Sequence, residues 1–263
     1  MQELILIKLG GSVITDKSKE YFAREENMVR LAKEIKNASK ISKSRIVIGH
    51  GAGSFAHTPA HKYQTKEGLI NKDSLYGMAV TEDAAKKLDM ILIKNLLEVG
   101  LPTFSFSPAS FIISDAKVYS KSYFDPVKKA LQIGIIPVVY GDVIVDKAIG
   151  CTIFSTEKIL SILAKELIKN YEIKIIYVTD VNGVYNAKGK TISEITNENF
   201  ESLKSSITGA KGVDVTGGML HKVEEALNLA KKTGIKTLII NGNKKDSLKN
   251  AILGTKVVGT LVR

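Results

Sequence analysis

The sequence predicts an α/β fold in which helices cover both sides of a mainly parallel sheet. Three observations support this prediction. Short, nearly continuous apolar runs rich in β-branched residues are typical of strands buried on both faces. Stretches with helical spacing of apolar residues lie between those runs. Glycine-rich segments stand at the ends of the runs or at helix starts, as expected at the ligand-binding edge of an open α/β sheet.

The expected elements alternate along the chain. Strands are expected at Leu4–Leu9, Arg45–Ile48, Ile136–Tyr140, Ile173–Thr179 and Thr237–Ile240. Helical spacing predicts helices at Asn27–Ala38, Leu75–Val99, Thr156–Ile168 and Gly218–Lys232. A hairpin or meander is expected within Phe111–Tyr119, and a final strand within Gly254–Val262. This alternation favours parallel strands joined through helices.

Composition indicates a soluble globular protein of 263 residues, with 44% hydrophobic and 25% charged residues. No apolar run approaches the roughly 18 residues of a membrane helix. A strand-like run begins almost at Met1 and leaves no room for a signal peptide. The single Cys151 excludes an internal disulfide and favours the cytoplasm and a place in the core. We expect one domain over residues 1–263, with a softer division into residues 1–150 and 151–263.

The net charge of +11 is compatible with nucleic acid, a membrane surface or a phosphorylated small molecule as partner. The lysines are scattered along the chain rather than gathered in one tract. No basic and aromatic segment resembles an RNA-binding signature. We therefore expect no nucleic-acid partner and no membrane, and assign most of these charges to solvated helix faces.

Three glycine-rich segments predict one phosphate-handling site: Lys8–Ser12, His50–His57 and Asp214–Gly218. Backbone N–H groups in such loops, and at the helix starts that follow them, attract anions. Lysines stand beside the first and third segments, and histidines bracket the second. Together the segments indicate an enzyme that moves a phosphoryl group.

Two familiar nucleotide motifs are nearly present and are rejected. The segment Gly11–Ser18 has the length of a P-loop, but Asp16 replaces the second glycine and would oppose phosphate binding. The segment Gly51–Ala56 matches a dinucleotide fingerprint, but we expect Pro59 to interrupt the following helix. No strand ending in an acid follows about 20 residues later either. A dehydrogenase is not expected.

The histidines do not predict a metal site. His57 and His61 are four residues apart, but Pro59 between them should spoil the helical face that would align them. No carboxylate or cysteine completes a ligand set with His50. We expect His61 at the surface, His50 in support of a strand end, and no protein metal ligand.

Three motifs resemble the amino acid kinase family: Lys8-x-Gly10-Gly11-Ser12, Thr179-Asp180-x-x-Gly183-Val184-Tyr185 and Asp214-x-Thr216-Gly217-Gly218-x-x-x-Lys222. Within that family, Ile14–Lys17 and His50–His57 look like the isopentenyl phosphate kinases. The resemblance covers essentially the whole chain. It implies a three-layer α/β/α sandwich, usually dimeric, with the phosphate acceptor in the N-terminal half and ATP in the C-terminal half. It also implies Mg²⁺ and a prenyl phosphate acceptor.

The same resemblance implies roles for individual residues. Lys8 and Lys222 contact the phosphates of ATP, Lys17 stabilises the transition state, and Glu157 organises the lysines. The residues implied to border ATP are Lys8, Gly10, Gly11, Ser12, Ser54, Thr179, Asp180, Gly183, Tyr185, Gly217, Gly218 and Lys222. Backbone donors at the glycines approach the phosphate oxygens closely.

On the acceptor side, the resemblance makes His57 the residue that binds the acceptor's phosphate. An imidazole, whose ordinary pKa is near neutrality, is suited to that task. Ala52, Gly53, Ser155 and Thr156 are expected around the same phosphate. The apolar tail is expected to meet Met78, Val143 and Ile153.

The segment Ser155–Lys158 departs from the family's typical Ser-Gly-Asp-Asp. Thr156 replaces a glycine, Glu157 lengthens a carboxylate by one methylene, and Lys158 is expected to add positive charge to the site. These differences leave three alternatives open. They are a kinase for another small phosphate or phosphonate such as fosfomycin, an amino acid or UMP kinase, and a ligand-binding protein that has lost catalysis.

Overall fold

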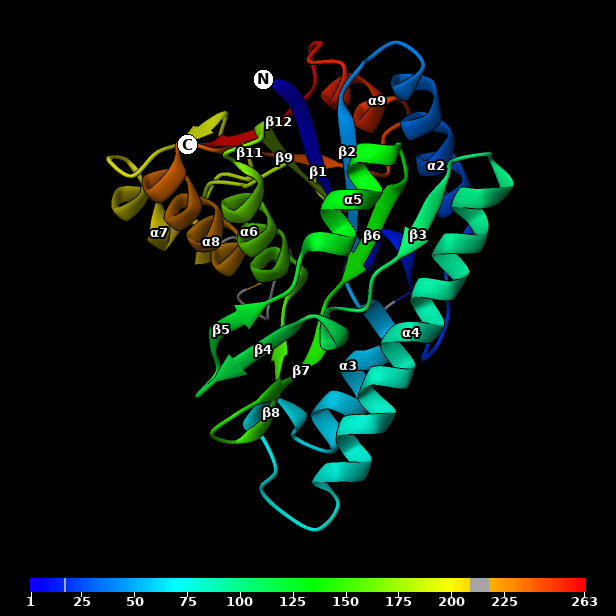
Figure 1. Ribbon diagram of the computed structural model, residues 1–263. Coiled ribbons are helices and arrows are strands. Elements are labelled where there is room, and N and C mark those ends of the chain that lie inside the picture. Colours follow the sequence, from blue (N-terminus) through cyan, green and yellow to red (C-terminus); the bar gives the residue numbers. More distant parts are fainter. Residues whose placement is uncertain (17, 209–217) are drawn as a thin grey trace.

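The computed structural model describes residues 1–16, 18–208 and 218–263 (Figure 1). In that part of the chain, eight strands form the main sheet in the order β10-β12-β11-β9-β1-β2-β6-β3. Every neighbouring pair is parallel except β11 and β12. The strands are β1 (Gln2–Leu9), β2 (Arg45–His50), β3 (Thr103–Ser105), β6 (Ile136–Tyr140), β9 (Tyr171–Thr179), β10 (Glu194–Ile195), β11 (Lys236–Asn241) and β12 (Gly259–Val262). The expected strands and the mainly parallel sheet are confirmed.

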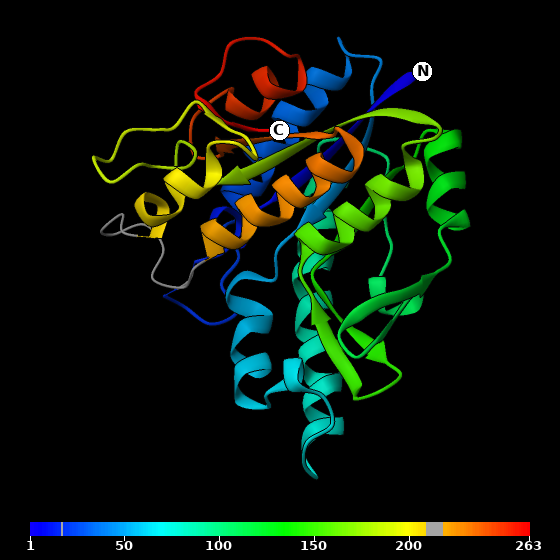
Figure 2. The ribbon, with the colours of Figure 1, turned by 90° about the vertical axis from the view of Figure 1, so that its left-hand side faces the viewer.

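Helices cover both faces of this sheet, because alternate residues of β1 enter two separate cores. Leu4 and Leu6 pack with the face covered by α5 (Asp125–Ile133), α6 (Thr156–Leu167), α7 (Phe200–Thr208) and α8 (Gly218–Thr233). Ile5 and Ile7 pack with the face covered by α2 (Glu25–Ser39), α3 (Gly53–Lys62), α4 (Ser74–Glu98) and α9 (Ser247–Ile252). Figures 1 and 2 show α6 and α8 together on one side of the sheet. The three-layer sandwich is confirmed, and no helix in the described ranges is long and apolar enough to cross a membrane.

A smaller sheet in the order β5-β4-β7-β8 extends from one end of the main sheet (Figure 1). Its strands are β4 (Ile112–Asp115), β5 (Val118–Ser122), β7 (Asp142–Asp146) and β8 (Gly150–Phe154). The antiparallel β4–β5 pair confirms the expected hairpin, whereas the β7–β8 hairpin was not predicted. The division expected between residues 150 and 151 falls inside β8. The division into two lobes stays a prediction.

Helix α3 corrects the expectation about Pro59. The helix runs from Gly53 to Lys62 with a buried Pro59 inside it. Because proline has no N–H, the carbonyl one turn earlier loses a hydrogen bond, but the helix continues. His57 and His61 therefore lie one turn apart on the same helix, both exposed. The dinucleotide motif remains excluded, because it requires a strand ending in an acid about 20 residues later. The next long element after α3 is the helix α4.

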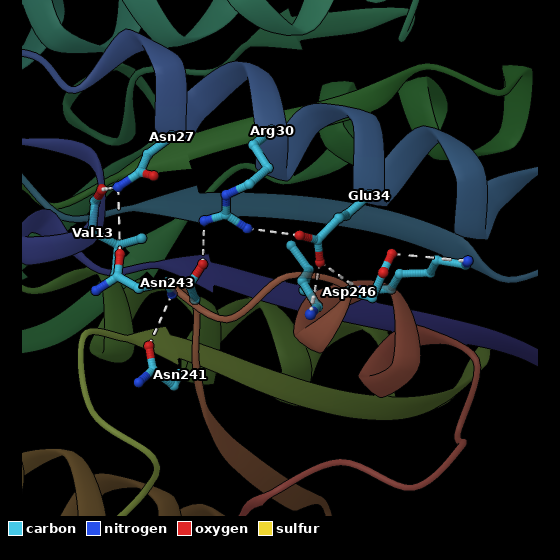
Figure 3. Close-up of polar contacts among 10 residues, drawn as sticks. Val13, Asn27, Arg30, Glu34, Asn241, Asn243 and Asp246 are labelled. Carbon is cyan, nitrogen blue, oxygen red and sulfur yellow. Dashed lines mark hydrogen bonds and ion pairs between the residues drawn. The ribbon is translucent and has the colours of Figure 1, made fainter.

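Helix α2 anchors the loop between β11 and α9 (Figure 3). Arg30 donates to the carbonyl of Gly242 and, at 2.7 Å, to Glu34 Oε1. Glu34 Oε2 accepts the backbone N–H groups of Leu248 at 3.0 Å and Lys249 at 3.2 Å. The first turn of α9 leaves such N–H groups without partners inside the helix, so a buried carboxylate from α2 satisfies them.

A further pair of amides extends this anchor. Asn27 Nδ2 donates to the Val13 carbonyl at 3.1 Å, next to the end of the short helix α1 (Gly11–Ile14). The side chain of Asn241 accepts the N–H of Asn243 and donates to Asn182, both at 2.9 Å. The end of β11 is thereby fixed to the loop after β9, while Arg30 fixes the following loop to α2.

We expect Glu34→Ala to lower the free energy of unfolding by roughly 1–3 kcal/mol, because two buried N–H groups lose their acceptor. Urea denaturation measures this change. The control is Asp83→Ala, which removes an exposed ion pair with Lys87 and should change stability by less than about 0.5 kcal/mol. Equal losses in the two variants would contradict the structural role given to Glu34.

Candidate functional site

A cavity of about 340 Å³ lies where strands β1, β2, β6 and β9 end and helices α1, α3, α6 and α8 begin. This is the edge at which open α/β sheets bind ligands. Most of the predicted site residues line it. They are Lys8, Gly10, Gly11, Ser12, Ala52, Gly53, His57, Val143, Ile153, Ser155, Thr156, Glu157, Thr179, Asp180, Gly218 and Lys222.

The six remaining predicted residues fall into two groups. Lys17 and Gly217 lie outside the described residues, as do Asp214 and Thr216 of the third glycine segment. Four others are described but lie away from the cavity wall: Ser54, Met78, Gly183 and Tyr185. Ser54 is buried, with its N–H donated to Thr15 Oγ1 at 3.1 Å. The roles assigned to these residues stay predictions.

Lys8 and Glu157 form a buried ion pair in the cavity wall. Lys8 follows Leu4 and Leu6 in the alternation of β1 and therefore faces α6. Glu157 lies in the first turn of α6, where the positive end of the helix dipole favours a carboxylate. The pair thus joins the centre of the sheet to the start of a helix.

The charges around Glu157 keep it ionised. Burial raises the pKa of its carboxyl, but the positive charges of Lys8 and Lys222 outweigh burial and lower that pKa from an ordinary 4.5 to about 2. Lys222 also donates to the Gly218 carbonyl at 2.8 Å, in the first turn of α8. The positive charges of two lysines therefore act on one carboxylate, in a site that can stabilise additional negative charge.

The first and second glycine segments are in direct contact. A Cβ on Gly11 would lie 2.7 Å from the backbone of Gly53, and one on Gly10 would lie 2.7 Å from the Val178 carbonyl oxygen. Gly53 has a φ of +50°, and a Cβ there would meet the Thr15 side chain. Only glycine fits this close approach of three chain segments. The two segments therefore lie side by side and line one cavity.

Ser12 connects the first segment to the end of β9. Its hydroxyl donates to Asp180 Oδ1 at 2.9 Å. Asp180 is exposed and follows Thr179, the last residue of the strand. The hydroxyl, the carboxylate and the glycine backbone therefore line the same cavity as Lys8 and Lys222.

Thr156 fixes the backbone at the end of β2. Its hydroxyl donates to the His50 carbonyl at 2.7 Å, and its methyl lies 2.7 Å from where a Cβ on Gly49 would be. The methyl of Thr156 therefore occupies space left free by a glycine in β2. The hydroxyl also satisfies a carbonyl at the strand's end.

The expectation that Lys158 adds charge to the site is wrong. Its Nζ donates to the Lys117 carbonyl at 2.8 Å and lies 3.6 Å from the centre of the Phe154 ring. Lys158 is absent from the cavity wall. Lys158 joins the start of α6 to the β4–β5 turn, because its Nζ contacts both the Lys117 carbonyl of that turn and the ring face of Phe154 in β8.

Sequence reasoning gave no role to Asp142, which the structure places in the cavity wall. It begins β7, lines the cavity and is buried. Burial raises its pKa to about 6, although the N–H groups of Ala109 and Val143 and the hydroxyl of Ser107 donate to it. The available signal was the Gly141–Asp142 pair at a strand end. Gly51 and Ala56 of the predicted segment His50–His57 also line the cavity, and the other lining residues that had no predicted role are Ala60, Thr81, Ala85, Gly141, Phe154, Val181, Met219 and His221.

We expect the stability contributed by Glu157 to depend on pH. Its pKa is lower in the folded chain than its ordinary 4.5, so its contribution is fully present above about pH 4.5 and is lost as pH falls towards 2. Glu157→Gln should therefore destabilise the protein strongly at pH 6 and progressively less towards pH 2.5. Urea denaturation of both proteins across this range measures the difference, and a constant difference would contradict the ionised pair.

Comparisons with known proteins agree with this architecture. The sequence pattern of the amino acid kinase family matches residues 3–241. A relative from Methanothermobacter thermautotrophicus is 35% identical, with 98% of each chain covered, and one from Methanocaldococcus jannaschii is 32% identical, covering 98% of this chain and 97% of the relative. Both are named isopentenyl phosphate kinase. A solved structure described as an X-ray structure of isopentenyl phosphate kinase superposes with a TM-score of 0.82 at 33% identity, covering 98% of this chain and all of that one. The chain belongs to the amino acid kinase family.

Proposed function

We propose that this protein transfers the γ-phosphoryl group of ATP to isopentenyl phosphate, giving isopentenyl diphosphate and ADP. One observation supports this most. A single cavity joins the Lys8–Glu157 pair and Lys222 to the glycine loop with His57 and to the apolar side chains of Val143 and Ile153. Phosphate-binding and apolar surfaces therefore meet in one place, as a prenyl phosphate requires. The names of the two archaeal relatives support the same acceptor.

In the proposed reaction, an oxygen of the acceptor's phosphate attacks the γ-phosphorus. A new P–O bond forms while the bond from the γ-phosphorus to the β–γ bridging oxygen breaks, and ADP leaves with that electron pair. Such transfers depend on positioning and charge stabilisation rather than on covalent catalysis. Lys8 and Lys222 neutralise the moving phosphoryl group, and Glu157 holds Lys8 in place. We assign Lys17 the additional role of stabilising the transition state.

We propose that ATP lies against Gly10–Ser12, Thr179, Asp180 and Gly218, where backbone N–H groups and the Ser12 hydroxyl meet its phosphates. Mg²⁺ commonly binds one or two carboxylates together with substrate phosphates. No group of three metal-binding side chains occurs among the described residues, so the ion fits as one held mainly by the phosphates of ATP. It supplies charge neutralisation on those phosphates.

We propose that the acceptor's phosphate contacts His57 and the N–H groups of Ala52 and Gly53. Ser155 and Thr156 border the same phosphate, since both line the cavity beside that loop. The prenyl tail contacts Val143 and Ile153, which lie on β7 and β8 of the smaller sheet. Met78 is half-buried on α4, one turn before Thr81 of the cavity wall, and would meet only the far end of a longer tail.

We further propose that residues 1–150 bind the acceptor and residues 151–263 bind ATP, in a cytoplasmic homodimer. The free, buried Cys151 is compatible with a reducing compartment. Exposed Met90 and Leu97 on α4 and exposed Phe104 on the edge strand β3 support a subunit interface on that face.

We expect isopentenyl phosphate and dimethylallyl phosphate to be turned over with the highest kcat/KM among small acceptors. The comparison set is fosfomycin, UMP and N-acetylglutamate, measured as ADP release with product detection by ³¹P NMR. Preference for a prenyl phosphate follows from the apolar wall beside the phosphate loop. Turnover of another acceptor without either prenyl phosphate would contradict the proposal, and so would no turnover of any of them.

We expect His57→Ala to lower kcat/KM for isopentenyl phosphate by at least about 100-fold, because one preorganised donor to the acceptor's phosphate is lost. The Kd for ATP, measured by calorimetry, should stay within about twofold. The matched control is His61→Ala, which removes an exposed histidine one turn along the same helix and outside the cavity wall. Equal kcat/KM values in the two variants would refute the role of His57.

A further inference from the structure

A chain of buried polar groups lies directly behind the loop that is proposed to bind the acceptor's phosphate. The His50 ring is fully buried and stacks on Tyr140 with centroids 5.3 Å apart. Its Nε2 lies 3.1 Å from Asp89 Oδ1, and its Nδ1 lies 3.3 Å from the Gly51 carbonyl oxygen. The Ser105 hydroxyl donates to the second oxygen of Asp89. These hydrogen bonds therefore connect Ser105 on the edge strand β3, through Asp89 on α4 and the His50 ring, to the carbonyl of Gly51.

The partners of the His50 ring define which atoms must donate. A carbonyl oxygen only accepts, so Nδ1 must have a proton to bond to Gly51. At Nε2 the partner is a carboxyl oxygen, and the other oxygen of that carboxyl already accepts from Ser105. Asp89, itself held by Ser105, therefore fixes the His50 ring in the orientation in which Nδ1 faces the Gly51 carbonyl.

The Gly51 carbonyl controls the direction of the next N–H group. No peptide bond in the described residues is cis, and in a trans peptide the carbonyl and the following N–H point in opposite directions. Holding the Gly51 carbonyl towards the buried His50 ring turns the Ala52 N–H the other way. Gly51 and Ala52 line the cavity while His50 does not, so that other direction is the cavity. No described residue accepts a hydrogen bond from this N–H.

The backbone of His50 is fixed as firmly as its ring. Its carbonyl accepts from the Thr156 hydroxyl at 2.7 Å and from the Gly141 N–H at 3.2 Å. Contacts from α4, α6 and β6 therefore converge on one residue that precedes the loop. That convergence leaves little freedom for the Gly51–Ala52 peptide to rotate.

We propose that His50 and Asp89 are positioning residues, which hold the Gly51 carbonyl inward and so direct the Ala52 N–H at the phosphate of the acceptor. The inference rests on the proposed function in that it takes this phosphate as the ligand of the loop. Neither residue touches the substrate. Their effect is on the affinity for the acceptor and not on the affinity for ATP.

Two substitutions of His50 separate this role from a merely structural one. In His50→Asn the side-chain amide nitrogen replaces Nδ1 and still donates to Gly51, while the contact with Asp89 is lost. In His50→Gln the amide nitrogen replaces Nε2 and keeps Asp89, while the contact with Gly51 is lost. Each variant loses one of the two buried hydrogen bonds that the His50 ring makes. Urea denaturation should therefore show a similar fall in the free energy of unfolding for both.

Kinetics should distinguish the two variants. We expect the KM for isopentenyl phosphate to stay within about threefold of wild type in His50→Asn and to rise about tenfold or more in His50→Gln, with the KM for ATP within about twofold in both. Glu34→Ala is the control for general destabilisation, since it removes a buried carboxylate that anchors a different loop and should leave the acceptor's KM unchanged. An equal rise in both His50 variants, or an equal rise in the KM for ATP, would overturn the inference.

Asp89 provides a second test should a His50 variant fail to fold. Asp89→Asn can donate to Nε2 and keep Nδ1 as the donor to Gly51, so its acceptor KM should stay near that of wild type. Asp89→Leu removes the partner and should raise it about tenfold. The same acceptor KM in both variants would overturn the inference.

Inorganic phosphate separates this inference from the proposed function. The amide resonance of Ala52 should shift on titration with phosphate in the wild type and in His50→Asn, but not in His50→Gln. If isopentenyl phosphate is not phosphorylated and this pattern is still seen, the proposed function fails and the positioning role stands. If isopentenyl phosphate is phosphorylated and the Ala52 amide is insensitive to phosphate in the wild type, the positioning role fails and the function stands.

Discussion

The buried ion pair between Lys8 and Glu157 is the interaction on which the rest of the site depends. Removing one partner of such a pair costs roughly 3–5 kcal/mol, because the other charge stays buried without compensation. Lys8 belongs to β1, between β9 and β2 in the main sheet, and Glu157 to the first turn of α6. The pair therefore fixes where α6 starts relative to the sheet, and with it Ser155 and Thr156.

The main elements and the meeting of the glycine segments could be predicted, for a simple physical reason. Buried parallel strands require continuous apolar runs, and the carboxyl ends of such strands meet at one edge. What failed depended on tertiary contacts. Pro59 is tolerated inside α3 because its ring is buried along with Phe55 and Ala56, on the packed face of the helix. The direction of Lys158 depends on the β4–β5 turn, whose Lys117 carbonyl accepts from its Nζ.

The side of the cavity that is proposed to bind the acceptor is built in two layers. The inner surface consists of glycine backbone, His57 and apolar side chains from the smaller sheet. Behind it lies the polar chain of His50, Asp89 and Ser105, which no spacing rule in the sequence reveals because its members come from β2, α4 and β3. Sequence reasoning predicted that His50 supports the strand end. Its ring contacts the Gly51 carbonyl on one side and Asp89 on the other. Thr156 connects the two layers through the His50 carbonyl.

The rate of phosphoryl transfer within the ternary complex tests the central claim most directly. In a single-turnover experiment with saturating ATP and isopentenyl phosphate, Glu157→Gln keeps the size and hydrogen-bonding capacity of the side chain but removes the charge that holds Lys8. We expect the transfer rate to fall by about 100-fold or more while both ligands still bind, because preorganised charge acts on the transition state. A transfer rate equal to that of the wild type would contradict the view that this ion pair organises the site.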